Sequence, residues 1–159
     1  MDLEDYEIIN LLRLSNSAIE ELRRREVVTT SNAPLGGYAE WLFRKAFGWK
    51  DAGNSNKDVD AIGRDGTRYQ IKSRRIHKRN KSRQLGALRR LDKENFDVLA
   101  AALFNEDFTV MRAALIPHRL VLNASDHVDE TNSGKFLLRD SVWSWDGVQD
   151  VTEKLKRAQ

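Results

Sequence analysis

Residues 58–73 read DVDAIGRDGTRYQIKS, and this stretch decides the fold because it carries the pattern of a β-hairpin. Polar and apolar residues alternate over 58–62 and over 68–73, which is the period-two pattern of a half-buried strand. The Gly-Arg-Asp-Gly segment between them contains an Asp-Gly pair, a strong signal for a tight turn. The pattern therefore predicts two adjacent antiparallel strands.

Helical and extended patterns flank this hairpin on both sides. Apolar residues recur at helical spacing before it, and apolar runs separated by polar turns follow it. This order predicts an α/β domain with a mixed central β-sheet flanked by helices. The expected helices are 6–25 (as one helix or two), 38–47, 82–91, a short one through 120–121, and 151–157; the expected extended segments are 27–30, 96–104, 108–116 and 136–145, with a loop at 31–37.

The length of 159 residues suits one domain with a hydrophobic core and is short for two. We expect a single domain, with an N-terminal helical element at 1–30, a core at 31–122 and a C-terminal strand and helix at 123–159. The acidic start is unlike a signal peptide, and no apolar run approaches the length of a membrane span. A cytoplasmic protein without a membrane partner is expected.

Positive charge is concentrated directly after the hairpin. The chain has 27 Lys and Arg against 24 Asp and Glu, yet residues 72–90 hold nine of these cations and no acid. A solvated helix face normally pairs its charges, whereas a local positive field is typical of a phosphate-binding surface. The segment therefore favours a nucleic-acid partner. The side chains expected to contact phosphates are Arg74, Arg75, Lys78, Arg79, Lys81, Arg83 and Gln84, of which Gln84 is equally suited to cap the helix expected at 82–91.

Four polar residues are candidates for chemistry: Glu40, Asp60, Gln70 and Lys72. Strand periodicity places Gln70 and Lys72 on one face, and the hairpin brings Asp60 alongside them. Because the chain has no cysteine and only three scattered histidines, a metal would take oxygen ligands, which suit Mg²⁺. A lysine ammonium can hold a water or offset negative charge on a phosphate. Asp58 shares the expected strand face with Asp60 and is an alternative carboxylate.

Asp60, followed ten positions later by Gln70-Ile71-Lys72 and preceded by a helix containing Glu40, resembles the motif set of the PD-(D/E)XK nuclease superfamily. This superfamily includes restriction endonucleases and Holliday-junction resolvases, and the resemblance covers roughly residues 20–116. It implies a restriction endonuclease-like core in which acids from a helix and two strands bind Mg²⁺ beside a lysine. On this resemblance Asp60 and Glu40 bind the metal, Gln70 stands in the place of the second strand acid, and Lys72 is the lysine.

The resemblance implies a Mg²⁺-dependent DNA endonuclease that hydrolyses phosphodiester bonds, with Mn²⁺ as a substitute metal and a role in restriction or defence. The sequence departs from the family pattern in two ways: Gln70 replaces an acid, as in Mrr-type restriction nucleases, and the proline before the aspartate is missing. A catalytically inactive DNA-binding module on the same fold is therefore the alternative, because one fewer negative charge weakens metal binding. A third hypothesis is an interaction protein whose basic segment binds RNA or an acidic partner. A homodimer would place two sites on the two DNA strands.

Overall fold

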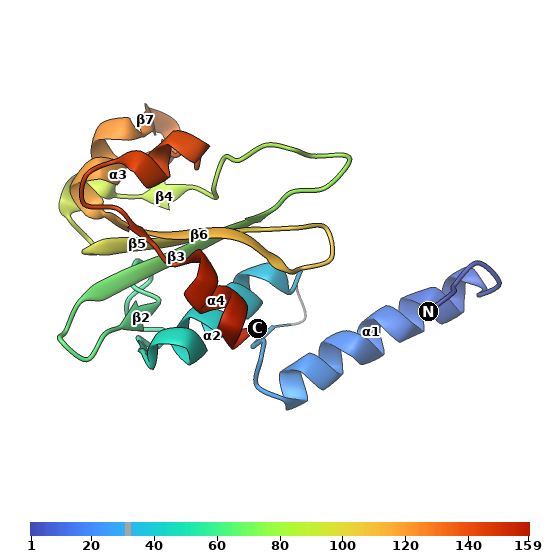
Figure 1. The fold of residues 1–159 in the computed structure, drawn as a ribbon. Coiled ribbons are helices and arrows are strands. Elements are labelled where there is room, and N and C mark those ends of the chain that lie inside the picture. The colour runs from blue at the N-terminus through green and yellow to red at the C-terminus, as the bar shows by residue number, and fades with distance from the viewer. Residues whose placement is uncertain (31–32) are drawn as a thin grey trace.

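A computed structural model describes residues 1–30 and 33–159 (Figure 1). The helices are α1 (Ile8–Arg24), α2 (Leu35–Phe47), α3 (His118–Ala124) and α4 (Thr152–Ala158), with 3-10 turns η1 (Leu91–Lys93), η2 (Asp129–Thr131) and η3 (Asp140–Ser144). The strands are β1 (Lys50–Asp51), β2 (Ala61–Ile62), β3 (Arg68–Arg75), β4 (Leu88–Arg89), β5 (Val98–Phe104), β6 (Val110–Pro117), β7 (Asp126–Val128), β8 (Ser133–Lys135) and β9 (Gln149–Asp150).

The central sheet has six strands in the order β1-β2-β3-β5-β6-β9. Strands β3 and β5 run parallel, whereas every other neighbouring pair in this sheet is antiparallel, so the sheet is mixed. A second, antiparallel sheet has the order β4-β8-β7. Helices α2 and α4 cover one face of the central sheet, and the small sheet lies over the other face (Figure 1). The α/β class and the mixed sheet flanked by helices are confirmed.

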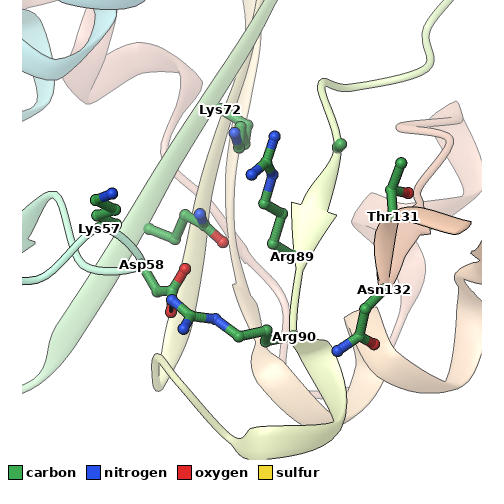
Figure 2. A pocket seen from close by; sticks show the side chains of 9 residues that line it. Lys57, Asp58, Lys72, Arg89, Arg90, Thr131 and Asn132 are labelled. Atoms are coloured by element: carbon green, nitrogen blue, oxygen red, sulfur yellow. Dashed lines mark hydrogen bonds and ion pairs between the residues drawn. The ribbon is translucent and has the colours of Figure 1, made fainter.

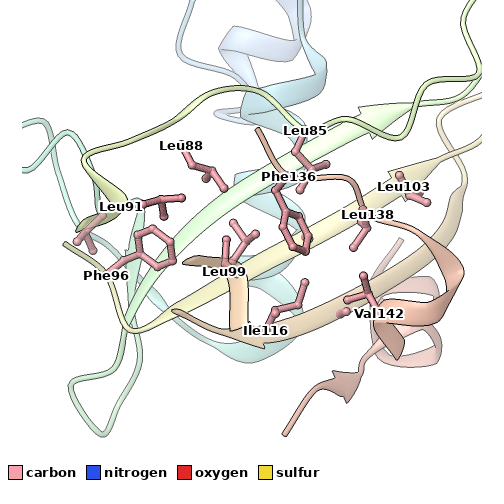
Figure 3. Close-up of a cluster of buried hydrophobic side chains, with 14 residues drawn as sticks. Leu85, Leu88, Leu91, Phe96, Leu99, Leu103, Ile116, Phe136, Leu138 and Val142 are labelled. Atoms are coloured by element: carbon pink, nitrogen blue, oxygen red, sulfur yellow. The ribbon is translucent and has the colours of Figure 1, made fainter. Parts of the chain in front are cut away.

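Strand β5 is buried on both faces, and its side chains alternate between two hydrophobic cores. Ala100, Ala102 and Phe104 pack with α2 and α4, while Leu99, Ala101 and Leu103 pack under the small sheet (Figure 3). The parallel register aligns Gln70 with Leu99 and Ile71 with Ala100. Since aligned residues of neighbouring strands point to the same face, Ile71 points toward α2, and Gln70 and Lys72 point toward the small sheet.

The predicted hairpin is present, with a shorter first strand than expected. Gly63 N–H donates to the carbonyl of Thr67 at 2.9 Å, and Gly66 takes a positive φ of 83° that favours glycine. Strand β2 covers only Ala61–Ile62, although Asp60 N–H still donates to the carbonyl of Tyr69 at 2.8 Å. The chain therefore joins the sheet at Asp60, and the residues before it lie outside the strand.

The prediction of a helix at 82–91 is wrong. The apolar residues Leu85, Leu88 and Leu91 recur every three positions and are all buried, which imitates a helical stripe. The backbone of Leu85 and Leu88 instead pairs with a distant segment: Leu85 N–H donates to the carbonyl of Phe136, and β4, which contains Leu88, pairs with β8. Leu91 begins η1. Partners from residues 133–138 therefore outcompete local helix formation.

Three further expectations at the ends of the chain need correction. Residues 27–30 form no strand, and the segment expected to be extended over 136–145 turns into η3 at Asp140. In the loop expected at 31–37, residues 31–32 lie outside the described part of the chain, and α2 already begins at Leu35. The remaining expected helices and strands are present with ends shifted by a few residues.

Helix α1 is one continuous helix, which settles the choice between one helix and two. It projects away from the two sheets (Figure 1), and its first turn exposes Ile8 and Ile9. Within residues 1–30 and 33–159, no helix combines the length and apolar character needed to cross a membrane.

Candidate metal and phosphate site

Helix α2 positions Glu40 at the margin of the hydrophobic core. Ala39, Leu42 and Phe43 are buried against the central sheet, and Gly48 ends the helix in the left-handed conformation. Glu40 follows the first of these buried residues and is itself half-buried. Its side chain lines a cavity of about 470 Å³, called the acidic cavity below.

Asp60 lines the same cavity and is held in place by strand β3. Its Oδ2 accepts a hydrogen bond from the backbone N–H of Ile71 at 2.7 Å, while its own N–H is bonded to Tyr69. The Oδ1 atom accepts no hydrogen bond from any residue that the structure describes. One carboxylate oxygen is therefore fixed, and the other is available to a ligand.

Two carboxyl groups of the acidic cavity, Glu40 and Asp60, have raised pKa values. Burial, and secondly the nearby Asp60 carboxylate, raise the pKa of Glu40 from its ordinary 4.5 to about 7. Burial also raises the pKa of Asp60, against the opposing effects of the Ile71 N–H and the Lys72 ammonium. A divalent cation between them would offset both the lost hydration and the repulsion, so this pair has the electrostatics of a cation site.

A third acid near the acidic cavity is already engaged. Asp51 forms an ion pair with Arg44 and accepts a hydrogen bond from Gly53 N–H at 2.8 Å. Both Asp51 and Arg44 line the cavity. In the described part of the chain, no group of three or more His, Asp or Glu side chains is arranged to hold a metal ion. A metal here would depend on Glu40 and Asp60, with water or substrate as its other ligands.

Gln70 and Lys72 line a second cavity of about 560 Å³, on the small-sheet side of β3. Lys57 lines both cavities, so the two are neighbours. Gln70 is only 5% exposed, and its Oε1 has no hydrogen-bond partner among the described residues. Lys72 is half-buried, and its charge partly opposes the rise that burial causes in the pKa of Glu40 and Asp60. The four predicted residues thus meet at one edge of the sheet but face two cavities.

Asp58 and Asp60 have different environments. Asp58 is 7% exposed, forms an ion pair with Arg90 and lines the second cavity with Gln70 (Figure 2). The expectation that it shares a strand face with Asp60 is wrong, because the chain enters β2 only after Asp58. With its charge paired to Arg90, Asp58 is the less available of the two carboxylates.

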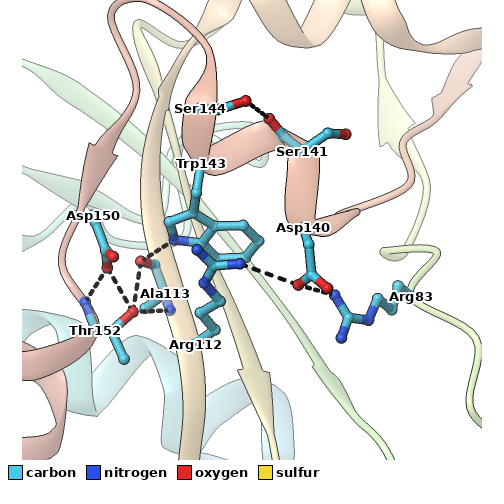
Figure 4. Close-up of polar contacts among 9 residues, drawn as sticks. All are labelled: Arg83, Arg112, Ala113, Asp140, Ser141, Trp143, Ser144, Asp150 and Thr152. Atoms are coloured by element: carbon cyan, nitrogen blue, oxygen red, sulfur yellow. Dashed lines mark hydrogen bonds and ion pairs between the residues drawn. The ribbon is translucent and has the colours of Figure 1, made fainter.

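The basic segment runs from β3 into a long loop that reaches β4 (Figure 1). Arg75 stacks over the ring of Phe108 at 4.5 Å, and Arg83 pairs with Asp140 at 2.6 Å (Figure 4). Asp140 also binds Arg112 at 3.1 Å, so Arg83 belongs to a structural cluster. Apart from Lys72 and from Arg75 on Phe108, the cations of this segment with no ion pair to any described acid are Arg74, Lys78, Arg79, Lys81 and Arg89. Of these five, Lys78, Arg79, Lys81 and Arg89 are exposed.

Gln84 does not cap a helix, because no helix follows it. It forms an isolated β-bridge with Leu137, and its backbone N–H donates a hydrogen bond to the hydroxyl oxygen of Ser82 at 3.2 Å. The sequence reasoning missed Lys57, Arg89 and Asn132, which line the second cavity. Lys57 stands directly before Asp58 in sequence, whereas Asn132 comes from a segment with no signal of its own.

Comparison with models of known protein families finds no match for this chain, and none of the curated proteins matches it either. The fold and the site define an α/β protein with a mixed six-stranded sheet, a small antiparallel sheet and two adjoining polar cavities at the edge of the larger sheet.

Proposed function

We propose that the protein is a Mg²⁺-dependent deoxyribonuclease that hydrolyses phosphodiester bonds within DNA. The observation that carries the proposal is the pair Glu40 and Asp60, two half-buried carboxyl groups with raised pKa values in one cavity beside Lys72. Groups whose pKa values are shifted by burial and by a neighbouring like charge gather at functional sites. The motif spacing Asp60–Gln70-Ile71-Lys72 supports the same assignment.

The residues fit a magnesium site with few protein ligands. Mg²⁺ is commonly held through one or two carboxylates, with waters and substrate phosphates completing an octahedron. The ligands would be Glu40 and the Oδ1 atom of Asp60, whose Oδ2 is already bonded to Ile71. When bound, such a cation polarises a phosphate and lowers the pKa of a coordinated water. Because Gln70 lines the neighbouring cavity, the proposal assigns the metal to these two acids alone.

Lys72 has the role of a charge-stabilising group in this proposal. It lies on β3 one residue after Ile71, the residue that holds the Asp60 carboxylate. Its ammonium is near enough to oppose part of the rise in the pKa of both acids. A fixed positive charge at this place favours the extra negative charge that develops on a phosphate as the bond to the attacking oxygen forms.

DNA is the proposed substrate because the unpaired cations continue away from Lys72. Arg74, Lys78, Arg79 and Lys81 follow it along β3 and the loop after it. Contacts from such side chains to phosphates position a strand without selecting its sequence. The affinity of the protein for DNA should therefore depend steeply on salt.

A cleavage assay tests this proposal. Supercoiled, linear and branched DNA are incubated with the wild type and with Glu40→Gln, Asp60→Asn and Lys72→Gln, in Mg²⁺ or Mn²⁺. The matched controls are Asp126→Asn and Lys135→Gln, exposed residues of the small sheet. We expect each site variant to lose about 100-fold or more of the cleavage rate while still binding DNA, and the controls to cleave normally.

The opposite result has a specific meaning here. If the wild type binds DNA but cleaves none of these substrates with either metal, the nuclease proposal fails, and the inactive DNA-binding module becomes the better account. The amide at Gln70 is the feature that favours that outcome, since it gives the site one negative charge fewer. Equal cleavage by the wild type and Asp60→Asn would also overturn the proposal.

A further inference from the structure

The second cavity is lined mainly by cations, and we call it the basic cavity. Lys57, Lys72, Arg89 and Arg90 contribute to its wall against the single carboxylate of Asp58 (Figure 2). Asp58 is paired with Arg90, which leaves three cationic side chains without a paired acid among the described residues. The basic cavity has a volume of about 560 Å³, which is within the range of about 300–1,000 Å³ common for small-molecule sites.

These three cations come from separate segments of the chain. Lys57 precedes β2, Lys72 lies on β3, and Arg89 lies on β4. The side chains of Lys72 and Arg89 both line the cavity (Figure 2). Like charges brought together by the fold repel one another, and an anion placed between them would offset that repulsion. Three unpaired cations match the two negative charges of a phosphate monoester better than the single charge of a phosphodiester.

A second feature of the basic cavity calls for a hydrogen-bond donor. The Oε1 atom of Gln70 is buried and has no partner within the described residues. A buried acceptor left in this way costs free energy, and the oxygens of a fully ionised phosphate cannot satisfy it because they only accept. A nucleotide carries both a phosphate and the N–H or O–H donors of its base and sugar.

The opposite wall of the cavity offers polar groups for the rest of such a ligand. Asn132 and Thr131 come from the turn between β7 and β8. The Thr131 hydroxyl shares a 2.6 Å hydrogen bond with Ser133, whereas the side-chain amide of Asn132 has no hydrogen-bond partner among the described residues. The backbone N–H of Arg90 donates to the carbonyl of Asn132 at 2.9 Å, which fixes this wall relative to β4.

We propose that the basic cavity binds one nucleotide that carries a phosphate monoester. Lys57, Lys72 and Arg89 bind the phosphate, and Gln70 Oε1 accepts a hydrogen bond from the base or sugar. The inference rests on the proposed function in taking the natural source to be the phosphorylated end of a nucleic-acid strand. A free nucleoside monophosphate has the same chemistry, so binding is measured without cleavage.

Calorimetric titration at low salt and without metal tests this inference. The probes are the four deoxynucleoside monophosphates, the matching nucleosides and inorganic phosphate. We expect at least one monophosphate to bind about 10-fold or more tightly than its nucleoside and than inorganic phosphate. Arg89→Gln should weaken that binding by about 10-fold or more, because it removes a charge-assisted contact. Lys78→Gln and Arg79→Gln, cations of the same segment outside the cavity, are the matched controls and should leave it unchanged.

Two further variants keep the test sharp. Gln70→Leu should reduce the preference for the nucleotide over inorganic phosphate, since it removes the acceptor and leaves the cations. Ala87→Phe adds bulk to the cavity wall without changing charge, and it should abolish nucleotide binding. Circular dichroism and thermal melting establish that each variant folds. If Gln70→Leu or Ala87→Phe melts at a lower temperature than the wild type, Arg89→Gln decides the test.

Oligonucleotides with a 5′-phosphate, a 3′-phosphate or neither distinguish a strand end from a free nucleotide. Tighter binding of one phosphorylated end supports the strand end, while tight binding of monophosphates alone supports a free ligand; either supports the cavity assignment. Equal losses for Arg89→Gln and Lys78→Gln, or no binding of any monophosphate, overturn it. Nucleotide binding without DNA cleavage would contradict only the nuclease proposal. DNA cleavage without nucleotide binding would contradict only the assignment of the basic cavity.

Discussion

The carboxylate of Asp60 accepts a hydrogen bond from the backbone N–H of Ile71 at 2.7 Å. The side chain of Ile71 is buried between the central sheet and α2, so the donor belongs to one of the most constrained parts of the molecule. Its two neighbours in sequence, Gln70 and Lys72, point to the opposite face. The position of Asp60 relative to Lys72 is therefore set by the packing of the core and needs no bound ligand.

Glu40 should make the protein less stable as the pH rises from about 5 to 7. Its folded pKa of about 7 exceeds the ordinary 4.5, so in this window the folded state holds a proton that the unfolded chain has released. The stabilising contribution of the protonated Glu40 is complete below pH 4.5, the ordinary pKa, and is lost above about pH 7, the folded pKa. Glu40→Gln should raise the free energy of unfolding at pH 8 by about 1–2 kcal/mol, after allowance for solvent screening of a partly exposed group.

Urea unfolding at pH 5 and pH 8 measures this effect as the difference between wild type and variant, so that other titrating groups cancel. The two proteins should converge at pH 5 and separate at pH 8. An identical pH dependence for both would contradict the raised pKa of Glu40.

Mg²⁺ should stabilise the folded protein, and more strongly at pH 8 than at pH 6, because Glu40 has to lose its proton to bind a cation. At a free Mg²⁺ concentration 100 times its Kd, the gain is about 2.7 kcal/mol. Thermal melting with and without Mg²⁺ measures it. Asp60→Asn should lose the gain, whereas Asp58→Asn should keep it despite a lower starting stability. Loss of the gain in Asp58→Asn alone would reassign the metal to that residue.

The basic segment should control how DNA affinity depends on salt. Each of Lys78→Gln, Arg79→Gln and Lys81→Gln should reduce the slope of log K against log salt by about 0.9 if the residue contacts one phosphate. Fluorescence anisotropy at several salt concentrations measures the slope. Arg83→Gln is the comparison, since Asp140 holds that guanidinium at 2.6 Å, and it should change the slope less. Four equal changes would contradict the expected difference between the paired Arg83 and the three unpaired cations.

The small sheet should tolerate no side chain at Gly134. A Cβ there would lie 2.4 Å from Leu91 Cδ1 and 3.0 Å from Ser125 Cβ, so Gly134→Ala should cost about 1–3 kcal/mol of stability through overpacking. Gly36→Ala is the matched substitution: no atom lies within 4 Å of its Cβ, and in α2 it should stabilise by about 0.5 kcal/mol. Chemical denaturation of both variants checks the contrast, and equal effects would contradict the packing at Gly134.

The hairpin could be predicted from sequence because its information is local. The Asp65-Gly66 pair sets the turn, and the alternation on either side sets the strands. The segment after β3 could not be predicted, since Leu85, Leu88 and Leu91 have the spacing of a helix, while the backbone partners of Leu85 and Leu88 are Phe136 and Gly134, far along the chain. The local spacing of apolar residues contains no information about such distant partners.

The candidate site shows the same limit. Strand periodicity correctly placed Gln70 and Lys72 on one face of β3, and spacing brought Asp60 and Glu40 to the same edge of the sheet. The division into two cavities depends on which face α2 covers and on the wall formed by β4 and η2, which are products of the tertiary fold. The roles proposed for these residues remain predictions that the experiments above decide.

The most direct measurement is anomalous diffraction from crystals soaked in Mn²⁺, a close substitute for Mg²⁺. The account predicts one anomalous peak in the acidic cavity, at about 2.0–2.3 Å from a carboxylate oxygen of Glu40 and from Oδ1 of Asp60. The peak should vanish in Asp60→Asn crystals. A fully soaked crystal with no peak between these two residues, or with its peak at Asp58, would contradict the shared cation site on which the nuclease proposal depends.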